Sequence, residues 1–204
     1  MSWFKTLVLD HSCVLCAART VVSPCPACLA PSLVHHPAPP LLLSQLITAY
    51  AYDSPAGDLI RLSKMTRERD AIDRLCTIAE QAFDPTVVEQ SIDAIVPVPA
   101  HWRTQVWRGF NAPDLLANRL SSRLKCNTIN VLTNRSYSSQ KSRTKLERRK
   151  HARQRYYCAA PFLTGNILLI DDIVTTGATL TACAAELLGA GATSVSAVAL
   201  CAVR

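Results

Sequence analysis

The stretch ILLIDDIVTTGAT, residues 167–179, decides the fold of this chain. Its first four residues are apolar and predict a buried strand that stops at Asp171 and Asp172. The small residues of TTGAT follow directly, and a helix is expected from Thr179 to Leu188. A strand, a turn and a helix in this order are typical of α/β proteins, which bind ligands beyond the carboxyl ends of parallel strands.

The acidic pair and the turn after it have the chemistry of a phosphoribosyl pocket. Two carboxylates can accept hydrogen bonds from the vicinal hydroxyls of a ribose. A glycine lets backbone N–H groups approach an anion closely, and the amides and dipole of the following helix act on the same anion. Threonine hydroxyls add further donors. We therefore predict that a ribose 5-phosphate is bound by Asp171, Asp172, Thr175, Thr176, Gly177, Ala178 and Thr179.

Apolar segments that suit strands alternate with segments of helical period along most of the chain. Such an alternation predicts βαβ units and therefore an α/β fold, with a parallel sheet flanked by helices. Gly189 and Gly191 are expected to end the last helix with left-handed backbone. We expect strands at residues 48–52, 92–98, 129–132, 167–170 and 195–201, and helices at 55–64, 69–83, 113–124, 146–154 and 179–188.

The segment IVPVPAHWRTQVWRGFN, residues 95–111, predicts a strand and a stiff proline turn followed by cations. Arg103 and Arg108 suit a multiply charged anion, because a guanidinium grips phosphate oxygens in two places. Basic residues after a strand are also common in plain surface turns, so this segment gains its meaning only together with the first.

Four of the nine cysteines lie in two C-x-x-C pairs near the N-terminus, separated by eight residues. An odd count without an export signal argues against a disulfide framework. Two such pairs can surround one structural Zn²⁺, since four thiolates close its tetrahedral shell. Redox use of a single pair and a ligand set of three cysteines with His11, His35 or His36 remain alternatives. The predicted ligands are Cys13, Cys16, Cys25 and Cys28.

The formal net charge is +7, from 22 Lys and Arg against 15 Asp and Glu, which favours anionic partners. The excess is concentrated between residues 135 and 155, where nucleic acid could bind, although a solvated face explains such a run equally well. No apolar run is long enough to cross a bilayer and no signal peptide is evident, so we expect a cytoplasmic protein. The nucleic-acid candidates are Lys145, Arg148, Arg149 and Lys150.

The sequence DDIVTTGAT resembles the phosphoribosyl-pyrophosphate loop of type I phosphoribosyltransferases. With the cysteine pairs and the VPVP, His101 and RGFN elements, nearly the whole chain is similar to the ComF/GntX family of competence-associated proteins. The resemblance implies a zinc-knuckle module and linker at residues 1–40 and a phosphoribosyltransferase-like domain at 41–204. It also implies that Arg103 and Arg108 bind pyrophosphate and that Mg²⁺ accompanies the phosphoribosyl pyrophosphate.

Three functions are open at this point. The resemblance implies a phosphoribosyl-pyrophosphate-binding protein that handles single-stranded DNA taken up during natural transformation. The first alternative is an active phosphoribosyltransferase with an unidentified acceptor. The second is an interaction module whose knuckles dock onto other DNA-uptake proteins. Trp102, Ala112 and His151 depart from the family pattern in segments expected to close over a substrate. They weigh against catalysis more than against ligand binding.

Overall fold

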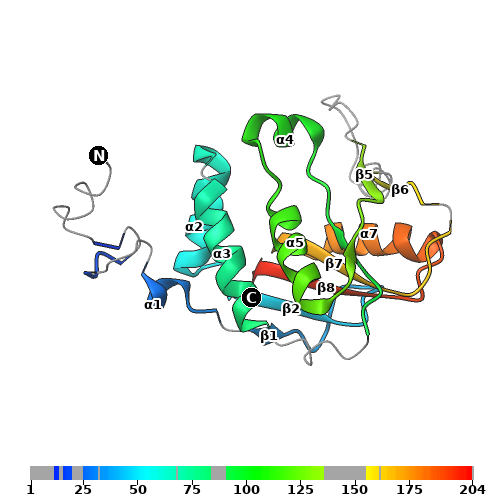
Figure 1. The fold of residues 1–204 in the computed structure, drawn as a ribbon, viewed down its shortest axis with the longest axis horizontal. Helices are drawn as coiled ribbons and strands as arrows, with labels where there is room; N and C mark the ends of the chain where they lie inside the picture. The colour runs from blue at the N-terminus through cyan, green and yellow to red at the C-terminus, as the bar shows by residue number, and fades with distance from the viewer. Residues whose placement is uncertain are drawn as a thin grey trace.

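The computed structural model describes residues 12–13, 16–19, 25–31, 33–67, 69–83, 91–135, 155–160 and 162–203. Its centre is a six-stranded sheet in the order β1-β2-β8-β7-β3-β4 (Figure 1). Only β1 runs antiparallel to its neighbour, so the sheet is mostly parallel, as predicted. The strands of this sheet are β1 (Val34–His35), β2 (Leu46–Ala51), β3 (Ala94–Pro97), β4 (Asn127–Thr128), β7 (Asn166–Val174) and β8 (Ser194–Ala202).

Helices cover both faces of the sheet, because side chains of the central strands alternate between two apolar layers. In β7, Leu168 and Ile170 face one layer, while Ile167 and Leu169 face the other. The first layer is closed by three helices and the second mainly by one. These are α2 (Pro55–Thr66), α3 (Arg69–Ala82) and α5 (Ala112–Leu124) on the first face, and α7 (Ala178–Gly189) on the second.

Local sequence explains where these helices begin and end. The hydroxyl oxygen of Ser54 accepts the N–H of Gly57 and caps α2, which opens on Pro55 and ends at left-handed Arg67. After α7, Gly191 takes a positive φ of 112°, whereas Gly189 is the last helical residue. The prediction of left-handed backbone was therefore right for Gly191 and wrong for Gly189.

The strand that carries the acidic pair is longer than predicted. We expected it to stop at Asp171, but β7 runs to Val174, and its last part pairs with β8 through Asp171–Ala199 and Val174–Ala202. The reason is that β8 offers an apolar partner along the same length. Ladder hydrogen bonds use the backbone and tolerate carboxylate side chains.

Two other predictions differ from the structure. The strand expected at 129–132 was wrong, because β4 ends at Thr128 and the next strand, β5 (Leu132–Asn134), begins only at the last expected residue. The chain leaves the main sheet between them, and β5 forms a separate pair with β6 (Tyr156–Cys158). The RGFN segment contains a short helix that we did not predict, α4 (Trp102–Arg108), which ends at left-handed Gly109. Figure 1 shows α4 at the top of the view, away from the sheet.

The N-terminal region is attached to the main core. Leu29, which ends the short helix α1 (Pro26–Leu29), is fully buried in the layer under α2 and α3. Its carbonyl accepts a hydrogen bond of 3.0 Å from the Tyr50 hydroxyl of β2. The division at residue 40 stays a prediction, and β1 joins the sheet from the N-terminal side of it. Within the described ranges, no helix combines the length and apolarity that a membrane crossing needs.

Candidate functional site

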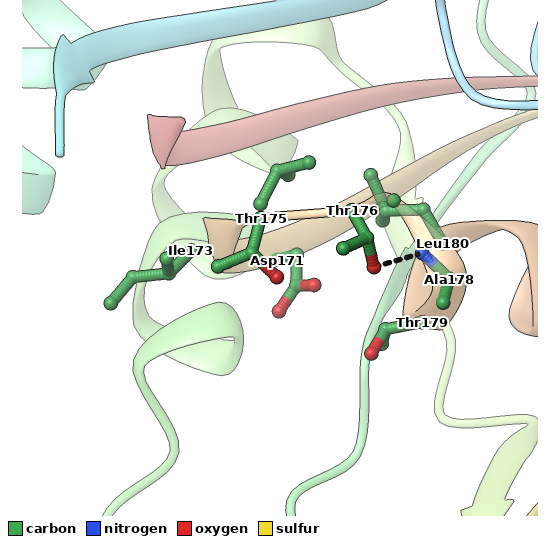
Figure 2. Close-up of a pocket in the computed structure, with 9 residues that line it drawn as sticks. Asp171, Ile173, Thr175, Thr176, Ala178, Thr179 and Leu180 are labelled. Atoms are coloured by element: carbon green, nitrogen blue, oxygen red, sulfur yellow. Dashed lines mark hydrogen bonds between the residues drawn. The ribbon is translucent and has the colours of Figure 1, made fainter. Parts of the chain in front are cut away.

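A small hollow opens where β7 turns into α7, with about 210 Å³ of space including its mouth. Figure 2 shows its lining, in which Asp171 and the threonines of the turn surround the start of the helix. The Thr176 hydroxyl accepts a long hydrogen bond of 3.4 Å from the N–H of Ala178. The hollow is lined by Asp171, Ile173, Val174, Thr175, Thr176, Gly177, Ala178, Thr179 and Leu180.

The backbone of the turn depends on Gly177, whose φ of 70° is left-handed. There is no room for a side chain, because a Cβ at this position would overlap the ring of Pro40. Pro40 belongs to the proline-rich segment that follows the cysteine pairs. The N-terminal segment therefore packs directly against the turn at residues 175–179.

Strand alternation places the two aspartates on different faces of β7. Asp171 shares the face of Ile167 and Leu169 and lines the hollow, with 7% of its surface exposed. Asp172 shares the face of Leu168 and Ile170, toward α2, and does not line the hollow. The sequence predicted both carboxylates for one ribose, but the structure brings only Asp171 together with the turn.

Burial dominates the electrostatics of Asp171. It raises the pKa of this carboxyl well above its usual range, and the neighbouring charge of Asp172 acts in the same direction. The N–H of Asp172 donates a hydrogen bond of 2.9 Å to Asp171 Oδ1 and partly offsets this effect. A carboxyl in such surroundings is easier to keep neutral, or to stabilise with added donors, than to leave as an isolated anion.

Lys64, which the sequence analysis did not predict for the site, lies beside the acidic pair. Lys64 lies in the last turn of α2, and its Nζ is 2.6 Å from Asp172 Oδ2. Both side chains are largely buried, with 22% and 18% exposed. This ion pair links two elements that are far apart in the sequence, so no local pattern could have revealed it. Lys64 is the natural counter-ion of Asp172 in this structure.

The segment after β3 is held beside the carboxyl end of β7. The N–H of Val98 donates to the carbonyl of Ile170 at 2.8 Å. The side-chain amide of Asn111, the last residue of RGFN, donates to the carbonyl of Val98 at 3.1 Å, and Asn134 of β5 donates to the carbonyl of Pro99 at 3.1 Å. Two asparagines thus fix the proline turn next to the acidic pair.

The two predicted pyrophosphate ligands differ in their surroundings. Among the described residues, Arg108 Nε is buried without a hydrogen-bond acceptor, which suits a residue that awaits an anion. Arg103 is exposed and lies 5.2 Å from the ring of Trp102. Neither lines the hollow, so their pyrophosphate role stays a prediction. The candidates Lys145, Arg148, Arg149 and Lys150, and the helix expected at 146–154, lie outside the described residues.

The four N-terminal cysteines form one cluster, as the C-x-x-C pairs predicted, and could hold a metal ion. Their sulfur atoms all lie within 4.8 Å of one another. Cys13 and Cys28 Sγ are 3.9 Å apart, and Cys16 and Cys25 Sγ are 3.7 Å apart. A tetrahedral ion with metal–sulfur bonds of about 2.3 Å needs sulfur–sulfur edges of about 3.8 Å. The donor set therefore fits a tetrahedral metal.

The electrostatics and the histidines around this cluster support the same set. Hydrogen bonding with Cys16, ahead of burial, raises the pKa of the Cys28 thiol, and a bound cation would reverse that balance. His35 hydrogen-bonds to Gln45 at 3.1 Å and His36 to Thr48 at 3.0 Å, on the sheet side. The described residues bring the four cysteines together, while His11, the third histidine of the alternative set, lies outside the described residues.

Comparison with known proteins shows the family to which the chain belongs. The chain is 31% identical to "DNA utilization protein YhgH" of Escherichia coli O6:H1 over 213 residues, covering 96% of this chain and 92% of that protein. The chain belongs to the ComF family. The phosphoribosyl transferase domain family matches residues 115–204, which include the hollow. "Competence protein F" of Haemophilus influenzae is 33% identical over 94 residues, covering 43% of this chain and 41% of that protein.

Solved phosphoribosyltransferase structures are more distant from this ComF-family protein. The glutamine phosphoribosylpyrophosphate amidotransferase of B. subtilis shares 16% identity at a TM-score of 0.39, covering 71% of this chain and 26% of that one. The adenine phosphoribosyl transferase of Trypanosoma brucei shares 13% identity at a TM-score of 0.37, covering 84% and 86%.

Replacing Gly177 with alanine should destabilise the protein by about 2–4 kcal/mol, since an L-residue is strained at this φ and its Cβ overlaps Pro40. Gly189→Ala is the matched control, because a Cβ there meets open space at the end of a helix. It should be neutral or stabilising by up to about 1 kcal/mol. Urea denaturation of both variants measures the difference, and equal effects would contradict this account of the turn.

Lys64→Met should destabilise the protein by about 1–3 kcal/mol, because it leaves the largely buried carboxylate of Asp172 without its partner. The double variant Lys64→Met/Asp172→Asn should cost less than the sum of the two single changes. Denaturation of the four proteins in this cycle gives the coupling energy. A coupling near zero would show that the pair contributes nothing to the fold.

Proposed function

We propose that this chain binds phosphoribosyl pyrophosphate at the carboxyl end of β7. The observation that carries the proposal is the hollow itself, where a buried aspartate, a left-handed glycine and exposed threonines precede a twelve-residue helix. This combination offers donors for a phosphate and an acceptor for a sugar hydroxyl within one turn of chain. The family match over residues 115–204 supports the same ligand class.

Each part of the ligand has a group of this chain to meet it. The 5′-phosphate would receive backbone N–H groups of residues 175–179 and the dipole of α7. A ribose hydroxyl would donate to Asp171, which lines the hollow, whereas Asp172 lies on the other face of β7 with Lys64. Arg108, with its buried Nε, and Arg103 would meet the pyrophosphate from the segment after β3. Mg²⁺ bound by the pyrophosphate would supply positive charge between the phosphates.

Ligand binding is better supported than catalysis. A transferase must stabilise charge on the departing pyrophosphate and exclude water from C1′. Helix α4, which carries both arginines, has no buried side chain, so it does not enclose a reacting centre in this structure. Among the described residues, the hollow is lined by Asp171 and residues 173–180. None of these residues has a side chain placed to recognise a nucleobase. Active transfer to an unidentified acceptor is the second candidate.

We also propose that the protein acts on single-stranded DNA. The support comes from the relatives, which are named as a DNA utilization protein and a competence protein, and from the net charge of +7. Such proteins need affinity for phosphate chains, which surface cations provide. Within this proposal the phosphoribosyl site serves as a sensor or a retained binding site, and other DNA-uptake proteins are its expected partners.

The cysteine cluster is proposed to hold a structural Zn²⁺ through Cys13, Cys16, Cys25 and Cys28. Four soft sulfur donors at tetrahedral spacing favour zinc and leave no coordination site for water. Because Leu29 directly follows Cys28 and lies in the main core, the metal would fix the N-terminal region against the sheet. This role is a structural one, although a partner surface on the same region is compatible with it.

Phosphoribosyl pyrophosphate with Mg²⁺ should raise the melting temperature of the wild-type protein, because binding to the native state stabilises it. Asp171→Asn should abolish the shift, and Asp172→Asn should reduce it less, since only Asp171 lines the hollow. Differential scanning fluorimetry measures all three. Asparagine keeps the side-chain shape, so each variant's ligand-free melting temperature serves as the control for folding.

Absence of a shift in the wild type would refute the proposed ligand. If the ligand binds, pyrophosphate release measured against a panel of nucleobases separates the two candidates. Turnover with any base would make the protein a transferase, while binding without turnover supports the sensor or retained site.

Purified protein should contain about one equivalent of zinc, and Cys13→Ser/Cys16→Ser should lose it. Cys126→Ser is the matched control, since Cys126 is a half-buried thiol outside the cluster. Elemental analysis after gel filtration measures the content. Zinc in the double variant, or its absence from the wild type, would contradict the assignment.

A further inference from the structure

Helix α4 presents an aromatic surface that the phosphoribosyl site does not use. Trp102 is 60% exposed, Val106 76% and Trp107 48%, and no side chain of this helix is buried. Two of the three tryptophans of the whole chain therefore lie within six residues of each other, on a helix that stands away from the sheet in Figure 1. Large exposed indole rings are costly to leave in water and mark interaction sites.

Each tryptophan of α4 has an arginine beside its ring. The guanidinium of Arg67, at the end of α2, lies 4.4 Å from the centre of the Trp107 ring. That of Arg103 lies 5.2 Å from the Trp102 ring. With Arg67 beside its ring, Trp107 is still 48% exposed as a residue, so a base has access to part of it. The surface thus combines open aromatic faces with fixed positive charge.

The charge of this surface selects its partner. Helix α4 carries Arg103 and Arg108 and no acidic residue, and Arg67 adds a third cation from α2. Bases of a single strand stack on aromatic rings, while arginines bind the phosphates between them. A duplex does not offer its base faces to such rings. An apolar protein partner would fit the rings but would have to cover three guanidinium groups.

We propose that Trp102 and Trp107, with Arg67, form a stacking surface for single-stranded nucleic acid. This inference rests on the proposed action on single-stranded DNA and gives it a location on α4 and the end of α2. These residues are different from the candidates predicted at Lys145, Arg148, Arg149 and Lys150. The rings supply affinity that is independent of base sequence, because every base has a π-face. Arg67 supplies a part that depends on salt.

Binding of a fluorescein-labelled oligothymidylate, followed by anisotropy, tests the surface. Trp102→Ala and Trp107→Ala should each weaken binding about tenfold, and the double variant about a hundredfold. Trp107→Phe should retain most of the affinity, because it keeps an aromatic face. Phe162→Ala is the matched control, since Phe162 is 90% exposed and lies elsewhere on the chain, and it should bind like the wild type.

Salt titration of the same variants separates the rings from the cations. The tryptophan variants should keep the wild-type slope of log affinity against log salt, whereas Arg67→Gln should lower that slope by about one. Wild-type affinity in Trp102→Ala/Trp107→Ala would overturn the proposal and leave α4 to a protein partner. If the wild type binds no oligothymidylate, the proposed action on DNA fails together with this surface, while the phosphoribosyl site is judged separately by its own melting shift.

Discussion

Parallel pairing of β7 with β3 on one side and β8 on the other fixes the carboxyl end of β7 at the centre of the sheet. Every element of the site is placed by this strand. The turn at Gly177 continues from it, Val98 hydrogen-bonds to Ile170 within it, and Lys64 reaches Asp172 from α2. Its last residues remain in the ladder, so the side chains of Asp171 and Asp172 must point to opposite faces. As a result, Asp171 lines the hollow on one face of β7, and Asp172 forms an ion pair with Lys64 on the other.

The sequence predicted what depends on local pattern. The apolar runs at 167–170 and 195–201 predicted the central strands, and the cysteine spacing predicted the cluster of four cysteines, because each signal lies within a short stretch of chain. What depends on distant contacts was missed. The extension of β7 needs β8 as a partner, and the Lys64–Asp172 pair joins α2 to β7. No residue of α4 is buried as a whole. The sequence of this helix therefore has no helical period of apolar residues from which it could be predicted.

Pro40 gives the N-terminal region a direct connection to the site. Its ring fills the space that a side chain at position 177 would need, and the carbonyl of Pro40 accepts the N–H of Leu43 at 3.1 Å. Ser44 then hydrogen-bonds to Val195 of β8, so the segment is held from both sides. The chain between the cysteine cluster and β2 therefore packs against the turn at residues 175–179. It is more than a spacer between two modules.

The charges around the acidic pair bear on how a carboxylate can lie beside the turn at Gly177, for which we propose a phosphate ligand. A second unpaired carboxylate beside Asp171 would repel the same anion that the turn attracts. Lys64 compensates Asp172 on the far face, and burial favours the neutral form of Asp171 through its raised pKa. Both effects reduce the negative charge that this part of β7 presents. An anionic ligand can approach the amides of α7 without first overcoming the repulsion of two aspartates.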